Sequence, residues 1–321
     1  MSIKSIKSGF LIVAALCVFA ASAVAADFPS RDIRLIVPWP AGGGVDGISR
    51  KISQIAEKSL GQSIYVENIG GAVTATGLMQ LTKARPDGYT IGVLTYDSII
   101  TLPRGKMVPG YSLDKMTPIA RITKEADAIV VSKQSGFKDF KGLIAAAKAK
   151  PNSVRVGVAP KGSGPYLAVR RLEKMTGVTF NVISYAGSSS AESEALLSGE
   201  LDAAISSLGD FSGLITSGDA LGIVELSSEQ NPSFPNVPPI SKLGHELETG
   251  SFILLAAPKN TPKAVITKLE TAFKQAYDSK EFQSWLVTVG VTPSWLGSDG
   301  VQKWIDQLQS TTFKVMDELK L

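Results

Sequence analysis

The stretch VPWPAGGGVDG, residues 37–47, follows a short apolar run at residues 33–37 and precedes a segment with helical periodicity. Apolar residues recur at helical spacing from Ile48 to Leu60, and Gly61 then ends the pattern. A strand, a glycine loop and a helix in this order form the junction at which open α/β sheets bind ligands. The stretch therefore predicts an α/β fold with a ligand at this loop.

The identity of that ligand is open between a dinucleotide and a smaller anion. Gly42, Gly44 and Gly47 fit the spacing G-x-G-x-x-G of dinucleotide-binding loops, a weak signal when it occurs alone. The fingerprint also needs glycine directly after the strand, whereas residues 38–41 intervene here. Asp46, a candidate N-cap, would place a negative carboxylate next to the negative pyrophosphate. A glycine turn that only caps the helix is a third interpretation. Backbone N–H groups and the positive helix end favour a carboxylate-sized anion.

The N-terminal residues have the pattern of a secretory signal peptide. Lys4 and Lys7 precede an apolar core at residues 9–20, and small residues with A-x-A spacing follow at residues 21–26. Cleavage is expected after Ala26, with the bond one residue earlier as the alternative. The pattern predicts export to the periplasm.

Composition limits the classes of protein further. Cys17 is the only cysteine and lies in the predicted signal peptide, so neither disulfides nor thiol chemistry are expected in the mature chain. The formal net charge is +4 without a run of basic residues, which gives no electrostatic footprint for nucleic acid binding. No later segment reaches the length of about 18 apolar residues that a membrane helix needs. We expect a soluble protein without a cofactor.

Strand-like and helix-like segments alternate along the chain, which predicts parallel strands with right-handed crossovers. Strands are expected at residues 33–37, 63–67, 89–95, 127–132, 154–158, 180–184, 201–206, 220–226 and 252–257. Helices are expected at residues 48–60, 78–84, 140–149, 166–175 and 190–197, from Pro262 with Thr261 as N-cap, and from about Gly300 to the C-terminus.

The alternation divides into two α/β units, the second inserted into the first. Strand-like segments near residues 119–129 and 250–257 are expected to carry the chain between the units. The first unit is predicted to comprise residues 27–124 and 250–321, and the second residues 125–249. The predicted architecture has two lobes, each a central sheet flanked by helices, joined by two crossover strands.

The glycine-loop device recurs in both units. Gly70-Gly71, Gly162-Ser163-Gly164 and residues 185–190 each lie between an expected strand and an expected helix. Two such loops in each unit, facing across a cleft, would hold an elongated dianion at both ends.

Several motifs together resemble one protein family: Arg34–Pro38 with the triple glycine and Asp46, Val66-Glu67-Asn68 before Gly70-Gly71, Arg85-Pro86-Asp87-Gly88-Tyr89-Thr90, Lys161-Gly162-Ser163, Tyr185-Ala186-Gly187-Ser188, and Ala257-Pro258 before Thr261-Pro262. The family is the periplasmic substrate-binding receptors of tripartite tricarboxylate transporters, also called Bug or TctC-like proteins. The resemblance implies a two-lobed periplasmic binding protein of type II, a monomeric flytrap. It also implies that the protein binds a small organic acid, a mono- or dicarboxylate, and delivers it to membrane permease subunits.

The resemblance also implies a set of ligand-binding residues. In the first lobe these are Trp39, Pro40, Gly42, Gly43, Gly44, Asp46, Gly71, Thr74, Thr76, Thr95, Asp97 and Ser98. In the second lobe they are Lys161, Ser163, Gly164, Ser188, Ser207 and Asp210.

The sequence departs from the family pattern at several of these positions. Trp39 stands where phenylalanine is common, Val45 replaces a usual threonine, and residues 163–166 read Ser-Gly-Pro-Tyr in place of Thr-Pro-Ser-His. Lys161 is a candidate for direct contact with a carboxylate. Asp97 lies in a loop that is more often glycine and threonine; it either favours an amine or hydroxyl donor on the ligand or caps the next turn.

The enzyme alternative finds little support in the residues. His245 is the only histidine, no G-x-S-x-G elbow occurs, and a His/Cys metal cluster is ruled out by composition. Asp127, Asp210, Glu192 and Glu194 are the acids considered for paired-carboxylate catalysis. No pattern places two of them together, and the two glutamates are expected on a solvated helix face. A receptor that presents its ligand to a sensor kinase, or a periplasmic enzyme, remains an alternative.

Overall fold

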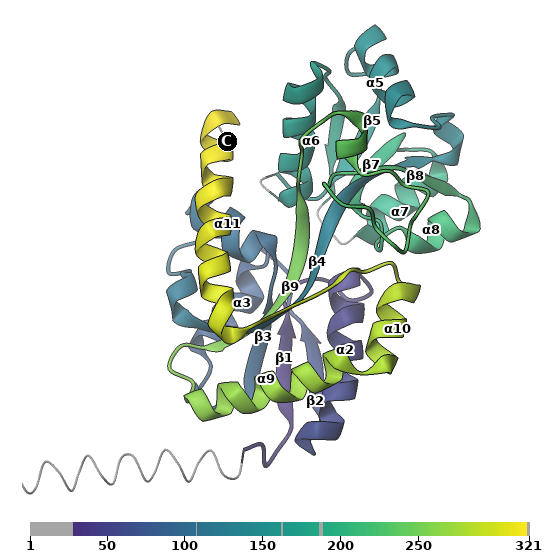
Figure 1. The fold of residues 1–321 in the computed structure, drawn as a ribbon. Helices are drawn as coiled ribbons and strands as arrows, with labels where there is room; N and C mark the ends of the chain where they lie inside the picture. The colour runs from purple at the N-terminus through teal and green to yellow at the C-terminus, as the bar shows by residue number, and fades with distance from the viewer. Residues whose placement is uncertain (1–27, 107, 162, 186–188, 320–321) are drawn as a thin grey trace, which may run out of the picture.

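A computed structural model describes residues 28–106, 108–161, 163–185 and 189–319. The predicted signal peptide and Ser188 lie outside these residues. The described chain forms two α/β lobes, joined by two long strands that run from one lobe into the other (Figure 1).

The first lobe is built on the sheet order β2-β1-β3-β9-β4, with β10 also paired to β4. Strands β2 and β3 are parallel to β1, whereas β3–β9, β9–β4 and β4–β10 are antiparallel. The strands are β1 (Ile33–Val37), β2 (Ile64–Asn68), β3 (Thr90–Leu94), β4 (Met116–Ser132), β9 (Gly250–Pro258) and β10 (Pro293–Gly297). The helices are α2 (Gly44–Leu60), α3 (Ala75–Lys83), α4 (Leu102–Gly105), α9 (Lys263–Asp278), α10 (Lys280–Thr288) and α11 (Ser298–Leu319).

The second lobe continues the sheet from the other half of β4, in the order β4-β7-β5-β6, with β8 also paired to β4. Strands β6 and β7 are parallel to β5, and β7 and β8 are antiparallel to β4. The strands are β5 (Arg155–Val158), β6 (Asn181–Ser184), β7 (Ala203–Ser207) and β8 (Ala220–Glu225). The helices are α5 (Phe140–Ala149), α6 (Gly164–Thr176), α7 (Ser189–Ser198) and α8 (Ser212–Ser217). Short helical turns are η1 (Asp97–Thr101), η2 (Leu113–Lys115), η3 (Lys133–Ser135) and η4 (Ile240–Leu243).

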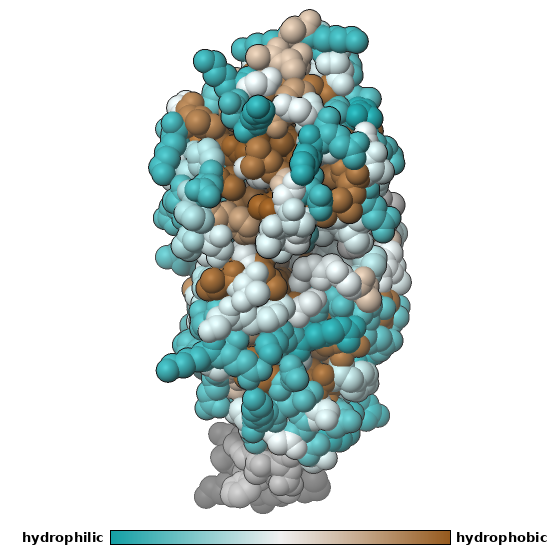
Figure 2. Space-filling model, turned by 90° about the vertical axis from the view of Figure 1, so that its right-hand side faces the viewer, coloured by the Kyte–Doolittle hydropathy of each residue, from teal (hydrophilic) through white to brown (hydrophobic). Residues whose placement is uncertain are grey.

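The two lobes are connected through β4 and β9. These strands pair from Met116 opposite Pro258 to Ala126 opposite Gly250. Gly250 has no room for a side chain, because a Cβ there would lie 2.0 Å from the Glu125 carbonyl oxygen. Seen from the right-hand side of Figure 1, the molecule is elongated along the axis that joins the lobes (Figure 2).

Each lobe has its own apolar core. In the first lobe, Ile48, Ile52 and Leu60 of α2 are buried against β1 and α9. The apolar residues that recur at helical spacing in the sequence therefore form the buried face of this helix. In the second lobe, the apolar faces of α5 and α6 pack on β4, β5 and β7. Trp304 and Ile305 of α11 belong to a further cluster with β9 and α3, as expected for a C-terminal helix packed on the first lobe.

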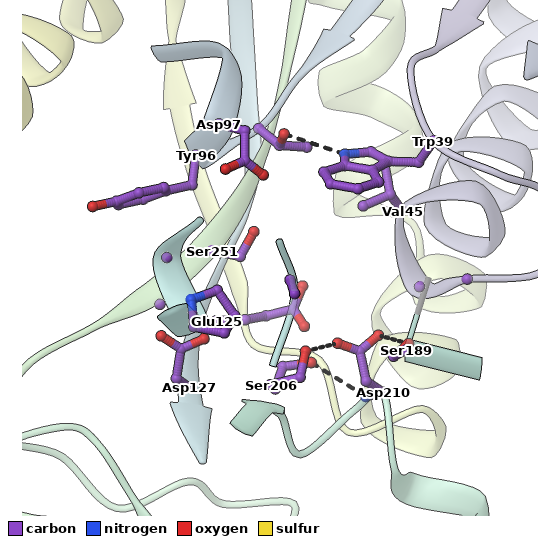
Figure 3. Close-up of a pocket in the computed structure, with 18 of the residues that line it drawn as sticks. Trp39, Val45, Tyr96, Asp97, Glu125, Asp127, Ser189, Ser206, Asp210 and Ser251 are labelled. Atoms are coloured by element: carbon purple, nitrogen blue, oxygen red, sulfur yellow. Dashed lines mark hydrogen bonds between the residues drawn. The ribbon is translucent and has the colours of Figure 1, made fainter. Parts of the chain in front are cut away.

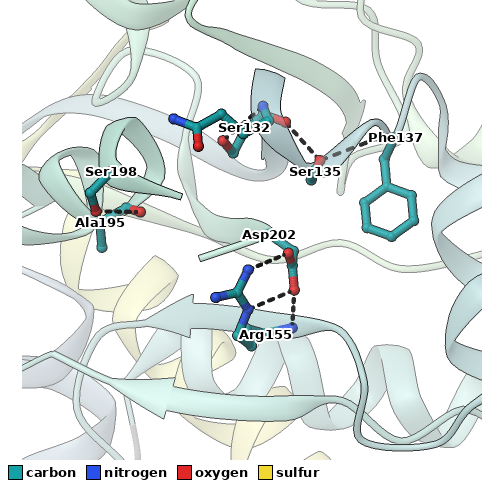
Figure 4. Close-up of polar contacts among 8 residues, drawn as sticks. Ser132, Ser135, Phe137, Arg155, Ala195, Ser198 and Asp202 are labelled. Atoms are coloured by element: carbon teal, nitrogen blue, oxygen red, sulfur yellow. Dashed lines mark hydrogen bonds and ion pairs between the residues drawn. The ribbon is translucent and has the colours of Figure 1, made fainter. Parts of the chain in front are cut away.

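Arg155 links two strands of the second lobe (Figure 4). Its Nε and Nη2 atoms donate to the two carboxylate oxygens of Asp202 at 3.0 and 2.7 Å, and its backbone N–H donates to the same carboxylate at 2.8 Å. This fork geometry fixes orientation as well as adding charge-assisted hydrogen bonds. It therefore holds the start of β5 next to the residue that precedes β7.

The structure corrects three local predictions. Thr261 is not the N-cap of the long helix; Pro262 is, and the Thr261 hydroxyl donates to the Pro258 carbonyl instead. That helix ends at Asp278, and a second helix begins at once because the Ser279 hydroxyl accepts from the Phe282 backbone N–H. Strand β10 was not predicted, since its irregular pairing with β4 leaves no clear alternation in the sequence.

Candidate functional site

A cavity of about 120 Å³ lies between the two lobes, next to the crossover strands. The loop before α2, the turn after β3, strands β4 and β9, and the starts of α6 and α7 line it (Figure 3). Clefts between domains are a usual place for small-metabolite sites.

The loop before α2 is held by Asp46, although not in the predicted way. The N-cap of α2 is Gly43, which has extended backbone and no side-chain cap, and Asp46 lies in the first turn of the helix. Its carboxylate reaches back to accept from the Gly42 N–H at 3.0 Å and also accepts from Arg50 and Asn68. Burial opposes ionisation, but these hydrogen bonds outweigh it and lower the pKa of Asp46. Asp46 therefore supports the loop as an anion.

The end of β3 places an aromatic and an acidic side chain at the cavity. The Trp39 indole N–H donates to the Thr95 hydroxyl at 3.3 Å, so the tryptophan ring is fixed against this strand end. Asp97 opens the wide helical turn η1 and accepts from the Thr101 hydroxyl at 2.8 Å. Turns of this kind are rare and occur often at functional sites. Asp97 therefore interacts within the turn and also lines the cavity.

The second lobe contributes the starts of two helices and the loop after β7. The Ser163 hydroxyl caps α6 by accepting from the Tyr166 N–H at 3.2 Å, and Gly164 follows at the cavity wall. In the loop after β7, the carboxylate of Asp210 accepts from the hydroxyls of Ser206 at 2.6 Å and Ser189 at 3.0 Å. These contacts aim Asp210 at the opposite lobe.

The two lobes meet around the cavity at three places. A Cβ on Gly44 would lie 2.9 Å from Asp210 Oδ1, and one on Gly164 would lie 3.5 Å from the Tyr96 ring. A Cβ on Gly209 would lie 2.9 Å from the backbone oxygen of Val289. Because each contact joins residues of different lobes, the structure has the closed form of the cleft.

The structure brings many, though not all, of the predicted ligand-binding residues to this cavity. Those that line it are Trp39, Pro40, Gly43, Gly44, Asp46, Thr95, Asp97, Gly164, Ser207 and Asp210. Those that do not line it are Gly42, Gly71, Thr74, Thr76, Ser98, Lys161 and Ser163, while Ser188 lies outside the described residues.

The residues away from the cavity have other surroundings. Lys161 is exposed, so it does not stand ready to meet a carboxylate in this form of the cleft. Thr74 and Ser98 are buried with their hydroxyls 3.4 Å apart, and Ser98 accepts from the Thr95 N–H. Gly71 is exposed on a loop whose next three residues all have positive φ. The second predicted loop thus supports η1 and does not reach the cavity.

Three carboxylates at the cavity were missed as site residues. Glu125 and Asp127 line it from β4, and Glu192 lines it from α7. Glu192 is only 3% exposed, so the expectation of a solvated face was wrong for it, whereas Glu194 is exposed. A signal existed for the first two, because residues two apart on a strand share a face. Nothing in the sequence placed α7 against them.

These acids share one low-dielectric space and raise one another's pKa. Burial raises the pKa of Asp127 to about 7, and the negative charges of Asp210 and Asp97 add to the effect. Burial and Asp210 raise the pKa of Glu125 to about 7 and that of Glu192 to about 8. Burial also raises the pKa of Asp97 to about 6. The structure thus brings together acids that no pattern in the sequence placed side by side.

Despite these acids, the described residues offer no metal centre. No group of three or more His, Cys, Asp or Glu side chains within the described ranges has the geometry to hold a metal ion. No Lys, Arg or His is among the described residues that line the cavity. Arg121, Lys124 and Arg171 line a wider groove of about 900 Å³ between α11 and the second lobe. This groove adjoins the cavity, and the residues that line both are Tyr96, Glu125, Gly164, Gly250 and Ser251.

Two further expectations concern residues outside the cavity. The Glu67 carboxylate accepts from Arg34 Nε at 2.6 Å, so Glu67 is the structural partner expected and not a ribose ligand. His245 is partly exposed and packs edge-on against Phe140, with ring centroids 5.9 Å apart. None of the helices in the described part of the chain combines the length and apolar character needed to cross a bilayer.

Two lobes joined by paired crossover strands, with a small closed cavity between helix starts, define a solute-binding protein of the periplasmic binding class. The comparisons with known proteins agree. The sequence pattern described as "Tripartite tricarboxylate transporter family receptor" matches residues 48–321, and the chain belongs to this family, named TctC. The Bug/TctC resemblance and the fold class predicted from the sequence are confirmed.

Individual relatives cover nearly the whole chain. Protein BugT of Bordetella pertussis is 28% identical over 307 residues, which is 92% of this chain and 94% of BugT. Among solved structures, MatC from Rhodopseudomonas palustris with bound malate has a TM-score of 0.79 at 24% identity, covering 90% and 99% of the two chains. An R. palustris protein with adipate has a TM-score of 0.83 at 24% identity, covering 92% and 99%. The family consists of solute receptors, so the enzyme alternative is set aside.

Proposed function

We infer that this protein is a periplasmic receptor that closes its two lobes on a small organic acid and delivers the acid to a membrane permease. The observation that carries the proposal is the closed cavity between the two lobes, lined by the starts of α2 and α6. Helix N-termini and glycine-loop amides are suited to a carboxylate. Relatives of the same fold hold malate and adipate, which are both small dicarboxylates.

The proposed mechanism is binding without chemistry. The lobes, taken as residues 27–124 with 250–321 and residues 125–249, rotate about β4 and β9. In the open form the cleft admits the solute, and in the closed form Trp39 covers it. A solute that binds the closed form better shifts the population toward it. Permease subunits of the tripartite tricarboxylate type then recognise the closed monomer.

The remaining parts of the proposal concern location and partner. The basic, apolar and small-residue order of residues 1–26 supports export through a cleaved signal peptide. A receptor that presents the same closed shape to a sensor kinase is the alternative. Capture of the partner by the closed protein in the presence of its solute separates the two.

A thermal-shift screen tests the receptor function. We expect a subset of small organic acids to raise the melting temperature of the mature protein without being turned over. Binding to the folded state alone stabilises it by about 2.7 kcal/mol when the free acid is at a hundredfold of its dissociation constant. The shift is expected to grow with the logarithm of acid concentration. Turnover of any acid, or no shift across the screen, would contradict the proposal.

A further inference from the structure

We propose that the solute of this receptor carries a protonated amine, which lies among the carboxylates of Asp97, Asp127 and Glu192 in the interlobe cavity. The proposal rests on the receptor function above and adds the chemical class of the solute. An amino acid with separated charges and a diamine share this chemistry, and the experiment below distinguishes them.

The first observation is the sign of the charges around the cavity. Its described lining contains Asp46, Asp97, Glu125, Asp127, Glu192 and Asp210, without a basic side chain. Asp46 is neutralised by the ion pair with Arg50, in which Nε lies 3.0 Å from a carboxylate oxygen. The other acids have no basic partner among the ion pairs of the described residues. A dianion alone would add negative charge to this space.

The second observation is an orphaned oxygen. Asp127 is 2% exposed, and its Oδ2 atom and the neighbouring Thr249 hydroxyl both lack a hydrogen-bond partner of good geometry among the described residues. In Figure 3, Asp127 points into the space between the lobes, with Asp97 across it and Asp210 to its side. A buried acceptor without a hydrogen-bond donor costs free energy, so a donor on the solute would stabilise the complex. An ammonium group supplies up to three donors and the opposite charge.

The third observation concerns the glycine loop itself. The start of α2 is the site at which the sequence predicted the carboxylate of a ligand. In the closed form, Asp210 Oδ1 lies so near Gly44 that a Cβ there would be 2.9 Å from it. Since Asp210 is fixed by Ser206 and Ser189, the protein places its own anion at this helix start. The solute therefore does not need a second carboxylate for this position.

A metal cation is the rival occupant, and the geometry argues against it. The acids that line the cavity come from η1, β4, α7 and the loop after β7. No three of the described acids lie close enough together to coordinate one ion. A metal ion needs several of these acids at once, whereas an ammonium group needs only one or two as acceptors, and the rest of the solute fills the space against Trp39.

Three solutes with the same four-carbon chain test the proposal by isothermal titration calorimetry. They are succinate with two carboxylates, 4-aminobutanoate with one carboxylate and one amine, and 1,4-diaminobutane with two amines. We expect at least one amine-bearing solute to bind tenfold or more tightly than succinate. Preference for 4-aminobutanoate indicates an amino acid as solute, whereas preference for 1,4-diaminobutane indicates a diamine and removes the organic-acid part of the proposed function.

The dependence on pH separates the two signs of solute charge. Glu125, Asp127 and Glu192, with pKa values raised to about 7 or 8 by burial, are partly protonated at neutral pH in the empty cavity. An ammonium group favours their charged forms, so binding releases protons at pH 7 and tightens between pH 5.5 and pH 8.5. A dianion favours the neutral forms, takes up protons and binds more tightly at low pH. Tyr96 stays neutral throughout, because burial and then Asp97 and Asp127 raise its pKa.

Two aspartate substitutions of the same kind test the residues. Asp127→Asn keeps the shape and removes the charge, and we expect a tenfold or greater loss of affinity for the preferred amine. Asp139→Asn is the matched control, since Asp139 is exposed, caps α5 and is equally well replaced by asparagine there. The melting temperature without solute verifies folding; if Asp127→Asn does not fold, Glu192→Gln takes its place.

Each outcome has a definite reading. Equal affinity of the two asparagine variants for the amine, or tighter binding of succinate with proton uptake, overturns the amine proposal and leaves the receptor function intact. If only acids without an amine bind in the wider thermal-shift screen, the amine proposal also fails alone. If neither the screen nor the four-carbon series gives any binding, the receptor function fails together with it.

Discussion

Gly250→Ala is expected to destabilise the closed protein by about 3 kcal/mol or more, because the new methyl group meets the main chain of β4. Its Cβ would lie 2.0 Å from the Glu125 carbonyl oxygen and 2.9 Å from the Ala126 Cα. Neither atom moves without separating β4 from β9, which are paired at this level. Glycine in a strand often marks such a close approach of another backbone. The backbone conformation of Gly250 itself is open to alanine, since its φ is not positive.

The measurement is thermal and denaturant unfolding of the mature protein without solute. A loss of this size corresponds to a fall in melting temperature on the order of 5–10 °C. Gly47→Ala is the control, because a Cβ there meets nothing within 4 Å and alanine is the better helix former inside α2. We expect the control to melt at the same temperature or slightly higher. A Gly250→Ala protein that melts with the control would mean that β4 and β9 do not approach so closely.

The sequence was a good guide to elements whose pattern is local. The apolar spacing of α2 predicted the helix, and Gly61 ends it with a positive φ of 70°, as a terminating glycine does. Helix α5 was predicted with its observed bounds, Phe140–Ala149. Both segments are amphipathic over several turns, so neighbouring residues alone determine which face is buried.

The sequence was a poor guide where side chains depend on the path of the chain. Asp46 is a residue type common at N-caps, but Gly43 is the N-cap of α2, and the Asp46 carboxylate accepts from the Gly42 N–H of the loop instead. Gly71 and Thr76 follow a motif that suggests ligand contact, yet they do not reach the cavity. Motif spacing cannot specify which of several neighbouring loops reaches the space between two lobes.

The acidic lining of the cavity depends on both lobes at once. Asp97 comes from the first lobe, Asp127 from the crossover strand and Glu192 from a helix of the second. These residues are far apart in sequence. The local sequence around each of them predicts only a turn, a strand end and a polar helix, respectively. Besides burial, Asp210 and Asp127 raise the pKa of Glu192 within the second lobe, whereas Asp97 acts on Asp127 from the first lobe. No periodicity encodes this arrangement. Only one part of the acidic lining could be predicted from the sequence, namely that Glu125 and Asp127 share one face of a strand.

Gly209→Ala is expected to weaken binding of the preferred four-carbon solute about tenfold or more, while leaving the stability of the separate lobes unchanged. In the closed form a Cβ on Gly209 would lie 2.9 Å from the Val289 backbone oxygen and 3.1 Å from Val291 Cγ2. These partners belong to the other lobe, so the clash is absent when the cleft is open. A strain of about 1.4 kcal/mol confined to the closed form is enough for a tenfold effect.

The shape of the protein provides a second measurement that needs no solute. X-ray scattering of Gly209→Ala should give a larger radius of gyration than the unmodified chain, since the population shifts toward the open form. Gly213→Ala is the matched control, because its Cβ meets nothing within 4 Å and lies in α8 of the same lobe. The control should keep both affinity and radius. If Gly209→Ala binds the solute as tightly as the control does, closure does not bring this loop against Val289. Solute recognition must then depend on contacts within one lobe far more than on the closure of two lobes.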